Sequence, residues 1–326
     1  MLPEVRRWLT RRTSRTEQWL VDRMLERKGG RRISVVLPAR DEAATIGRIV
    51  TVVREALVER TGLVDEVLVV DSCSRDATAA IAAAAGATVV AQDAVLAELP
   101  PARGKGEALW KGLAASTGDL VAAIDADLRD VEPAFVTGLL GPLLADPGVA
   151  FVKGFYHRPL VGDGTVDVDG GGRVSELVAR PLLNLAWPRL AGFVQPLAGE
   201  FAARRELLEA IPFATGYGVE LAMLVDVLEH AGLDAMAQVD LGVRVHRHHD
   251  LQTLGRMAAQ IQLAAAARMA RTGVLTRTPE TTSLVQFRRP SEPGPGGLDR
   301  EVVVTDVAVE ERPPLREVLA ASRPVA

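Results

Sequence analysis

The sequence has a single cysteine and no long apolar run. One cysteine in 326 residues excludes a disulfide framework and predicts a reducing cytoplasm as the location. No uninterrupted apolar run approaches the roughly 20 residues that a membrane-spanning helix needs. The first residues also lack the apolar core and small-residue cleavage site of a secretory signal. We therefore expect no integral membrane association.

A strong excess of positive charge is lacking too. The formal net charge is −4, which argues against broad nucleic-acid binding. The charge is uneven, because residues 1–32 carry ten Lys/Arg and four Asp/Glu, a net +6 against −10 for the rest. We interpret this segment as helical, packed on the domain with a solvated basic face. A membrane-surface helix or a transit peptide is the alternative.

Apolar strands alternate with helical segments from Ile33 onward. The pattern predicts strands at Ile33–Leu37, Val67–Val70, Thr88–Ala91 and Leu120–Ile124, and helices at Glu42–Arg60, Ser74–Ala85 and Gly106–Ala115. Near-continuous apolar strands separated by helices predict an α/β fold, with a mostly parallel sheet covered on both faces. Ligands bind such sheets outside the carboxyl ends of the strands. Polar side chains follow three of these strands, at Arg40, Asp41 and Glu42, at Asp71 and Ser72, and at Asp125 and Asp127.

The second half of the chain is less regular. Residues 158–172 hold five Gly and three Asp, which predicts a mobile active-site loop. Helical spacing recurs at Arg173–Trp187, Tyr217–His230 and Leu251–Arg271. Beyond Thr276 the chain holds seven of its 19 prolines, so we expect an extended or partly disordered tail.

A nicotinamide-binding enzyme is disfavoured by a missing glycine-rich turn. That fingerprint needs glycines directly after the first strand, so that the backbone can approach a pyrophosphate. The turn here is Pro38-Ala39-Arg40-Asp41-Glu42, with no glycine.

The triplet Asp125-Ala126-Asp127 suits a different ligand. It closes an apolar strand, so its two carboxylates emerge together at the strand end. Hard oxygen ligands there can hold Mg²⁺ or Mn²⁺. Such a metal neutralises a nucleoside-diphosphate leaving group. The alternative is that the triplet only caps a helix.

A second group of candidates lies at Val243–His246, which reads as a short strand. Arg244 suits a bidentate contact with phosphate, and a neutral His246 suits a metal. His248 and His249 follow at once, so spacing alone leaves the identity of the ligand open, and a solvent-facing histidine is the alternative.

Two helix starts have the composition of anion sites. Gly104–Leu109 places Lys105 at a helix N-terminus, although it is not a Walker sequence. Gly170–Ser175 repeats the design with Arg173 and Ser175, which predicts a phosphorylated or carboxylated acceptor. A flexible linker is the competing interpretation of this second stretch.

Taken in order, these stretches resemble the retaining glucosyl-3-phosphoglycerate synthases of actinobacteria, which have the GT-A fold. The resemblance runs from about residue 30 into the tail, where Leu284–Phe287 and Glu311–Pro314 also match. Its main stretches are Ile33–Ala39, Pro101–Trp110, Ile124–Leu128, Gly170–Arg173, Gln195–Glu200, Gly216–Glu220 and Leu241–Arg247.

The resemblance implies that UDP-glucose and 3-phosphoglycerate give glucosyl-3-phosphoglycerate with Mg²⁺ or Mn²⁺. This is the first step toward glucosylglycerate and methylglucose lipopolysaccharide. It also implies a homodimer. By matched position, the donor side comprises Pro38, Ala39, Arg40, Glu42, Ser72, Lys105, Asp125, Ala126, Tyr217, Glu220 and Arg244. The implied metal ligands are Asp127 and His246, and the implied acceptor residues are Gly172, Arg173, Val174, Ser175 and His248.

The chain departs from the family pattern at a few of these positions. Arg40-Asp41 replaces a more usual Leu-Asn, and Cys73 stands where Gly is common. Ser175 replaces Thr, and His248 stands where an Asn is expected near the acceptor, which puts that contact in question.

The resemblance completes the expected organisation and mechanism. We expect a basic helical segment at 1–32, a nucleotide-sugar-binding core at 33–150, an acceptor-binding and metal-completing part at 151–275 and a Pro-rich tail at 276–326. The hypothesised mechanism is front-face displacement, in which Arg244 and the Asp127-bound metal stabilise the departing UDP. Glu220 positions the sugar rather than forming a covalent bond to it. The alternatives are a GDP-glucose or GDP-mannose donor, a non-catalytic nucleotide-sugar-binding protein, and a membrane-bound lipid or polysaccharide transferase.

Overall fold

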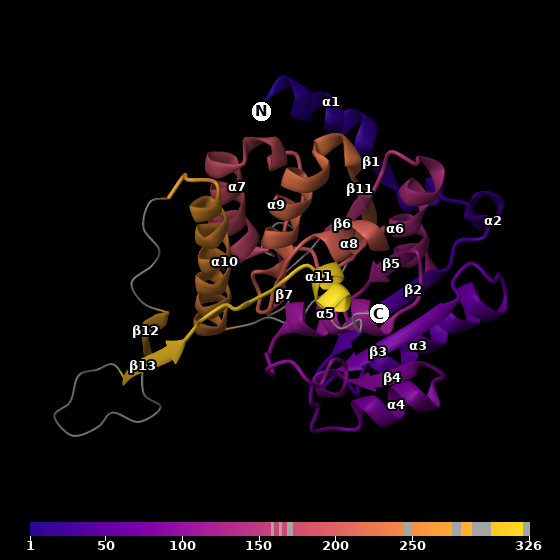
Figure 1. Cartoon of the computed structure of the whole chain (residues 1–326), viewed down its shortest axis with the longest axis horizontal. Helices are drawn as coiled ribbons and strands as arrows, with labels where there is room; N and C mark the ends of the chain where they lie inside the picture. The colour runs from indigo at the N-terminus through magenta and orange to yellow at the C-terminus, as the bar shows by residue number, and fades with distance from the viewer. Residues whose placement is uncertain are drawn as a thin grey trace.

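An eight-stranded sheet forms the centre of the computed structural model, which describes residues 1–157, 160–162, 165–167, 172–243, 250–275, 282–288 and 301–321 (Figure 1). Its strand order is β1-β11-β6-β9-β5-β2-β3-β4, and every neighbouring pair is parallel except those that β9 makes. The strands are β1 Thr13–Arg15, β2 Ile33–Ala39, β3 Glu66–Asp71, β4 Thr88–Ala91, β5 Leu120–Ala123, β6 Phe151–His157, β9 Phe201–Arg204 and β11 Met236–Val243. The predicted mostly parallel α/β sheet is confirmed.

Helices cover both faces of this sheet, and each face has its own hydrophobic core. Along β2, Val35 and Leu37 belong to one core and Val36 to the other, as the two-residue period of a strand requires. One core is completed by α2 Val21–Lys28, α3 Ile46–Val53, α4 Thr78–Ala84 and α6 Pro133–Ala145. The other is completed by α1 Pro3–Arg12, α5 Lys105–Ala115, α7 Arg180–Ala186, α8 Arg205–Ala210, α9 Val219–Ala231, α10 Leu251–Arg271 and α11 Leu315–Ala321.

The helix predicted over 42–60 begins later than expected. Its first turn is replaced by a loop in which the backbone N–H groups of Asp41, Glu42 and Ala43 donate to side chains of the β3–α4 connection. These bonds hold the segment in a loop, so α3 starts only at Ile46, and it continues as a π-helix over Arg54–Glu59. The helix predicted at Leu251–Arg271 is confirmed, and the one predicted at Tyr217–His230 begins at Val219.

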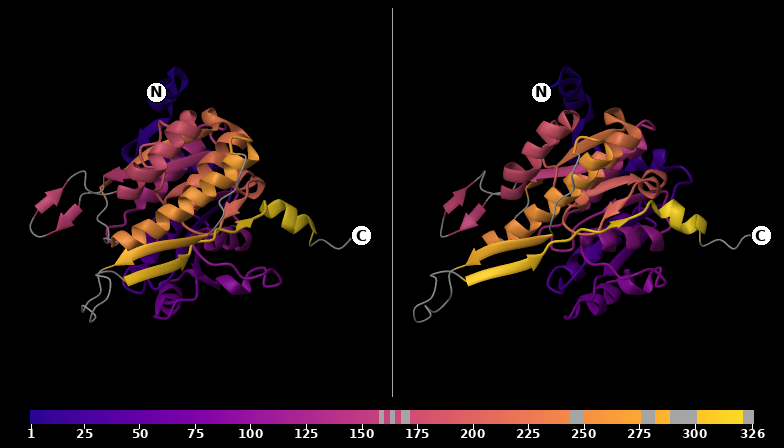
Figure 2. Two further views of the ribbon diagram at one scale, coloured as in Figure 1. Left: turned by 90° about the vertical axis from the view of Figure 1, so that its left-hand side faces the viewer. Right: turned by 60° about the vertical axis from the view of Figure 1, so that its left-hand side comes forward.

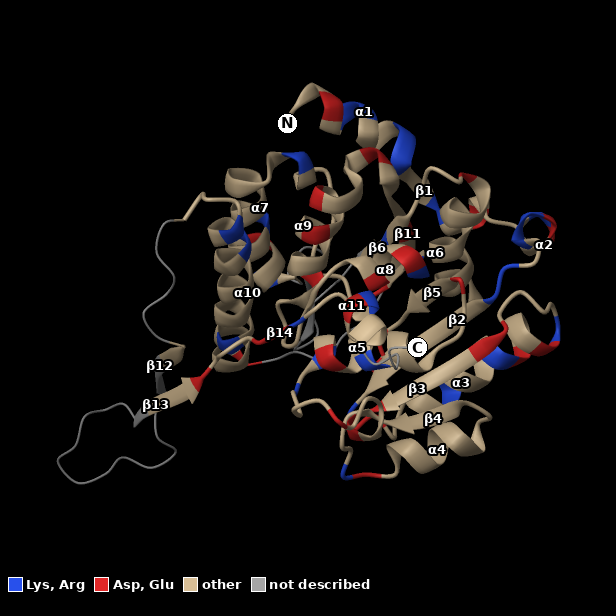
Figure 3. Ribbon diagram, in the orientation of Figure 1, with Lys and Arg blue, Asp and Glu red and all other residues tan. Residues whose placement is uncertain are grey.

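The N-terminal segment is not helical throughout, which corrects the expectation for it. Between α1 and α2, residues Thr13–Arg15 form β1 and extend the sheet by pairing in parallel with β11. Helix α1 packs on the domain through Val5 and Trp8, whose Nε1 donates to the Met236 carbonyl at 2.8 Å. Basic residues are prominent along α1 and α2 (Figure 3).

The described parts of the C-terminal tail contain regular structure that its proline content does not predict. Strands β12 Ser283–Arg288 and β13 Glu301–Asp306 form an antiparallel hairpin that extends away from the sheet (Figure 2). Strand β14 Glu311–Arg312 then pairs with β10 Phe213–Ala214, and α11 follows with Leu315 fully buried. The tail therefore returns to the core and contributes to it.

Only parts of the glycine-rich stretch 158–172 are described. Strands β7 Leu160–Gly162 and β8 Thr165–Asp167 pair in antiparallel fashion there, so part of the predicted loop is a hairpin. Over the described ranges, no helix has the length and apolar character needed to cross a membrane.

Candidate active site

The candidate site lies where the chain reverses its direction of travel across the sheet. From β2 the chain proceeds to β3 and β4 on one side, and it then crosses back to place β5 on the other side of β2. The crevice outside the carboxyl ends of β2 and β5 is therefore a topological switch point, where such sheets bind ligands. Beyond the end of β5, the Ala126 carbonyl accepts a hydrogen bond from the Thr45 hydroxyl at 2.6 Å.

Three predicted residues meet in this crevice as a charged triad, which we define as Lys105, Asp125 and Glu220. The Lys105 ammonium lies 2.5 Å from Asp125 Oδ1 and 2.9 Å from Glu220 Oε1. Burial acts against the Lys105 charge, but the two carboxylates outweigh that effect and raise its pKa, so it stays protonated. The family resemblance assigned all three residues to the donor-binding site, and the structure brings them into direct contact.

Three glycines allow the triad to assemble. Gly104 precedes α5 with a φ of 109°, and a Cβ there would lie 2.6 Å from the Thr215 carbonyl oxygen. A Cβ on Gly106 would lie only 1.7 Å from the Ala214 oxygen, so α5 can approach β10 only without a side chain there. At Gly199, a Cβ would lie within 2.4 Å of the Lys105 ammonium and both Asp125 oxygens. The stretches singled out from sequence thus contain glycine because the backbone passes directly against other backbone at Gly104 and Gly106 and against charged groups at Gly199.

A second buried cation beside the triad was not predicted from sequence. Lys153, in the middle of β6, is 1% exposed, and its ammonium has no hydrogen-bond partner within the described structure. Burial lowers the pKa of Lys153 to about 8, opposed by the charges of Glu220, Glu200 and Asp125. The available signal was a lysine inside an otherwise apolar strand, Phe151-Val152-Lys153-Gly154-Phe155.

The predicted uridine-binding residues lie at two neighbouring strand ends. Pro38 and Ala39 end β2, and the Ser72 N–H, just after β3, donates to the Ala39 carbonyl at 2.8 Å. The Ser72 hydroxyl donates to Gln92 Oε1 at 2.6 Å. Arg40 is exposed and Glu42 is half-buried beside them.

The backbone conformation explains two positions in this region, Asp41 and Cys73, at which the chain departs from the family pattern. Asp41 and Cys73 have φ angles of 57° and 59°, in the left-handed region that favours Gly and tolerates Asn and Asp. Asp41 is therefore a conformational match for the more usual Asn. Cys73 adopts a glycine-like conformation, and its thiol accepts a hydrogen bond from Arg103 Nη1 at 2.8 Å.

The two acids of the Asp125–Asp127 triplet have different environments. Asp125 is mostly buried in the charged triad, whereas Asp127 is exposed two residues further on. The next helix, α6, begins at Pro133 with Glu132 as its N-cap, so the alternative that the triplet caps a helix is wrong. An exposed carboxylate is a fitting ligand for a hard divalent cation.

The remaining predicted residues fall partly outside the described chain. Arg244, His246 and His248 lie outside the described residues, so their predicted roles stay predictions. Gly172 has a φ of 75° and precedes a helical turn at Arg173 and Val174, while Ser175 is 6% exposed and opens a π-helix. Tyr217 is 45% exposed, and its N–H donates to Gln260 Oε1 at 3.0 Å.

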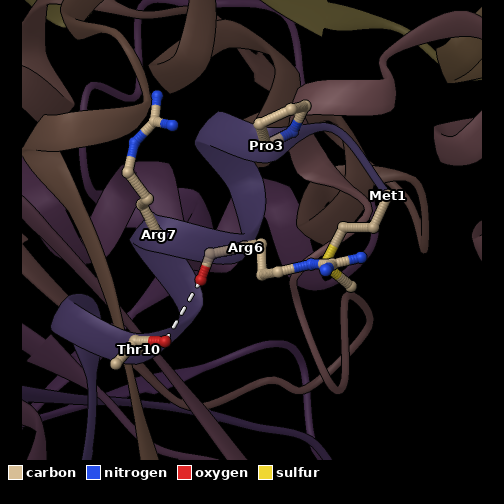
Figure 4. A pocket seen from close by; sticks show the side chains of 5 residues that line it. All are labelled: Met1, Pro3, Arg6, Arg7 and Thr10. Carbon is tan, nitrogen blue, oxygen red and sulfur yellow. Dashed lines mark hydrogen bonds between the residues drawn. The ribbon is translucent and has the colours of Figure 1, made fainter.

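A pocket at the N-terminus involves none of the predicted site residues. It is lined by Met1, Pro3, Arg6, Arg7 and Thr10, and the Thr10 hydroxyl donates to the Arg6 carbonyl at 3.2 Å within the helix (Figure 4). The pocket belongs to α1, which lies apart from α5, the helix that begins at Lys105 (Figure 1).

Comparison with known proteins agrees with the predicted fold and family. The family model described as Glycosyl transferase family 2 matches residues 34–209. A glucosyl-3-phosphoglycerate synthase of Mycolicibacterium smegmatis is 47% identical over 309 residues, which cover 95% of this chain and 97% of that protein. The chain belongs to glycosyl transferase family 2, and the resemblance to the glucosyl-3-phosphoglycerate synthases and their GT-A fold is confirmed.

Solved structures add information on ligands. Mannosyl-3-phosphoglycerate synthase from Rubrobacter xylanophilus superposes with a TM-score of 0.87 at 43% identity, covering 96% of this chain and 98% of that one. Glucosyl-3-phosphoglycerate synthase from Mycobacterium tuberculosis has been solved in complex with Mn²⁺, UDP and glucosyl-3-phosphoglycerate. It superposes with a TM-score of 0.79 at 44% identity, covering 92% of this chain and 96% of that one. The same enzyme has been solved with Mn²⁺, UDP-glucose and phosphoglyceric acid, and with Mg²⁺ and UDP, at TM-scores of 0.79 and 0.81.

Proposed function

We propose that this protein transfers glucose from UDP-glucose to 3-phosphoglycerate, with retention of anomeric configuration, to give glucosyl-3-phosphoglycerate. The observation that carries the proposal is the Lys105–Asp125–Glu220 triad, assembled at the switch point of a fold whose relatives bind these substrates. Asp125 and Glu220 hold Lys105 at the N-terminus of α5. The helix dipole there adds to the attraction of the Lys105 ammonium for a diphosphate.

Each group at the site has a proposed role in the transfer. Pro38, Ala39, Arg40, Glu42 and Ser72 hold the uridine at the ends of β2 and β3, while Lys105 and Arg244 receive the diphosphate charge. Tyr217 and Glu220, at the start of α9, hold the glucose. Gly172, Arg173, Val174, Ser175 and His248 bind the phosphoglycerate and present its hydroxyl to the same face of the sugar that UDP leaves.

We propose Asp127 and His246 as the residues that hold Mg²⁺ or Mn²⁺. When bound, the metal neutralises the negative charge that develops on the leaving diphosphate. Asp125 then keeps Lys105 and the turn in place rather than binding the metal, because its carboxylate is already engaged. The proposed functional division of the chain remains 1–32, 33–150, 151–275 and 276–326.

The hypothesis that Glu220 positions the sugar without a covalent bond has support in its contacts. Its Oε1 is held by Lys105 at 2.9 Å, which weakens the carboxylate as a nucleophile and fixes its orientation. Trapping of a glucosyl–Glu220 adduct by mass spectrometry would contradict this role.

A different donor is the second candidate function. The high superposition with a mannosyl-3-phosphoglycerate synthase favours considering GDP-mannose or GDP-glucose on the same acceptor. The test is a turnover screen of purified protein with UDP-glucose, GDP-glucose and GDP-mannose, each with 3-phosphoglycerate, glycerate or no acceptor. We expect the fastest product formation with UDP-glucose and 3-phosphoglycerate, and an axial anomeric bond in the product by NMR. A preference for either GDP-sugar would overturn the donor assignment, and no transfer at all would favour a nucleotide-sugar-binding protein.

We propose a homodimer in a reducing cytoplasm as the native state. The family resemblance supports the dimer, and the single, exposed Cys73 thiol supports the compartment. Light scattering of the purified chain tests the dimer, and a monomer at working concentration would refute it.

A further inference from the structure

Gln92 is a buried glutamine beside Ser72, one of the proposed uridine-binding residues. Strands β3 and β4 pair in parallel with Asp71 opposite Ala91, so Ser72 and Gln92 are the next residues along the two neighbouring chains. Gln92 is 1% exposed, and its Oε1 accepts a hydrogen bond from the Ser72 hydroxyl at 2.6 Å. The proposed reaction has so far given this glutamine no role.

The other partners of the Gln92 amide fix the direction in which it faces. Its Nε2 donates to the Ala102 carbonyl at 3.1 Å and to Asp93 Oδ1 at 3.4 Å. A carbonyl and an ionised carboxylate only accept hydrogen bonds, so the amide NH₂ must face them and Oε1 must face Ser72. The reversed amide would place Gln92 Oε1 and the Ala102 oxygen 3.1 Å apart with no proton between them.

The orientation of this amide in turn fixes the polarity of the Ser72 hydroxyl. An amide oxygen carries no proton, so the hydroxyl must donate to it, and a hydroxyl has only one proton to donate. The Ser72 oxygen keeps its remaining lone pairs, and it can therefore meet a ligand only as an acceptor. Ser72 is half-buried, so part of it remains accessible at the end of β3.

We propose that Gln92 is a positioning residue for base recognition, because it fixes the Ser72 hydroxyl as an acceptor for the ring N–H of the donor's base. This inference rests on the proposed function. Uracil presents N3–H, whereas cytosine presents an N3 lone pair that an acceptor oxygen repels. A ribose hydroxyl both donates and accepts, so a fixed polarity would give no selectivity there. Guanine also carries a ring N–H, so this contact leaves the choice between UDP and GDP to other residues.

The proposal is tested with Gln92→Leu, which removes the acceptor and keeps a side chain of similar size, and with Ser72→Ala, which removes the hydroxyl. Gln238→Leu is the matched control. Gln238 is another glutamine with 1% exposure, but its amide makes its hydrogen bonds with Thr13 and with the backbone of residues 192 and 194. Titration calorimetry with Mg²⁺ measures the Kd of UDP and of CDP for each protein.

We expect the wild type to bind UDP about tenfold or more tightly than CDP, because one mismatched hydrogen bond changes Kd by about that factor. In Gln92→Leu the Ser72 hydroxyl can turn and donate to cytosine N3, so the preference for UDP should fall to about threefold or less. Gln238→Leu should lower Tm and keep the wild-type preference. If Gln92→Leu keeps the wild-type preference, even with weaker binding of both nucleotides, the proposal is overturned.

The double variant separates positioning from a purely structural role. Ser72→Ala should also lower the preference for UDP, because it removes the oxygen that meets the base. Adding Gln92→Leu to Ser72→Ala should change the preference no further, since both substitutions act through one contact. A further fall in the double variant would overturn the proposal, and so would a wild-type preference in Ser72→Ala.

A measurement on the wild-type protein keeps the proposal testable if Gln92→Leu does not fold. The analogue 4-thio-UDP keeps the N3–H and weakens the acceptor at C4, whereas CDP loses the N3–H. We expect 4-thio-UDP to bind within about threefold of UDP, and CDP to bind about tenfold more weakly or worse. Equal losses with the two analogues would overturn the proposal, as would equal binding of CDP and UDP. If the protein binds UDP-glucose but makes no glucosyl-3-phosphoglycerate, the proposed function fails instead, and the ratio of UDP to CDP binding still decides the role of Gln92.

Discussion

Arg312 and Glu107 form a buried ion pair that joins the C-terminal tail to the helix carrying Lys105. Arg312 Nε lies 2.7 Å from Glu107 Oε2 and its Nη2 lies 2.8 Å from Oε1, with side chains 10% and 1% exposed. The same guanidinium donates to the Pro100 carbonyl at 2.5 Å and stacks over the Trp110 ring. Replacing Arg312 with Met keeps much of the apolar packing and removes the charge.

The expected loss is large because Glu107 would remain buried without its partner. Breaking a buried ion pair from one side costs about 3–5 kcal/mol in free energy of unfolding. At about 2 °C per kcal/mol for a chain of this size, Tm should fall by roughly 6–10 °C. We also expect a lower kcat/KM, because the tail holds the loop before α9. The Glu310 carbonyl accepts from Thr215 N–H at 3.1 Å, and the Thr215 carbonyl accepts from Glu107 N–H at 3.3 Å.

Urea and thermal unfolding of Arg312→Met, Glu107→Gln and the double variant measure the pair itself. The double variant leaves no unpaired charge, so it should be more stable than the two single losses predict, with a coupling of about 2 kcal/mol. A Tm for Arg312→Met within about 2 °C of the wild type would refute the reasoning. Losses that simply add in the double variant would show that the two side chains do not act as a pair.

Three further predictions concern the site. Gly199→Ala should lower kcat/KM about a hundredfold, because the added methyl group would displace the Lys105–Asp125 ion pair beside it. A change of less than about threefold in steady-state kinetics would contradict this prediction. Asp127→Asn should weaken Mg²⁺-dependent UDP binding in calorimetry, whereas the control Asp130→Asn, which is also exposed on this turn, should not. EDTA should abolish turnover reversibly. Wild-type metal dependence in Asp127→Asn would contradict the role of Asp127 as a metal ligand. The pKa of Lys153 is about 8 in the folded chain and about 10.4 in the unfolded chain. Between these pH values the unfolded state binds more protons than the folded state. Lys153 therefore makes the free energy of unfolding rise with pH over this range, by at most about 3 kcal/mol. Urea unfolding should therefore show a smaller rise from about pH 7 to about pH 10 in Lys153→Met than in the wild type, and equal slopes would show that Lys153 keeps an ordinary pKa.

The sheet could be predicted from sequence because its central strands are buried on both faces. Runs such as Val67–Val70 are continuous in apolar residues, and the structure extends that strand by one residue at each end, to Glu66–Asp71. The short edge strands could not be predicted in this way. Thr13–Arg15 is polar, and it becomes a strand only because β11 offers an edge to it. The strand Glu311–Arg312 is likewise held in place by the long-range ion pair of Arg312 with Glu107, which hydrophobic periodicity cannot predict.

The site was predictable to the extent that its residues stand in recognisable stretches. Lys105 and Glu220 are 115 positions apart, and only the resemblance to a family placed them in one site before the structure showed their contact with Asp125. Lys153 stands alone in an apolar strand, and its lowered pKa depends on burial and on charges from four other segments. Sequence patterns carry neither of these properties.

The structure also distinguishes the two acids of the Asp125–Asp127 triplet by their surroundings. A carboxylate that binds a metal gives up its charge to that metal, whereas Asp125 already shares its charge with Lys105 at 2.5 Å. If Asp125 also bound the metal, Lys105 would face a cation in place of its partner, and like charges would be forced together in a mostly buried site. Asp127 is exposed and lies two residues further along the turn. The proposed roles therefore combine a mostly buried acid, which holds the lysine, with an exposed acid, which we propose as the metal ligand.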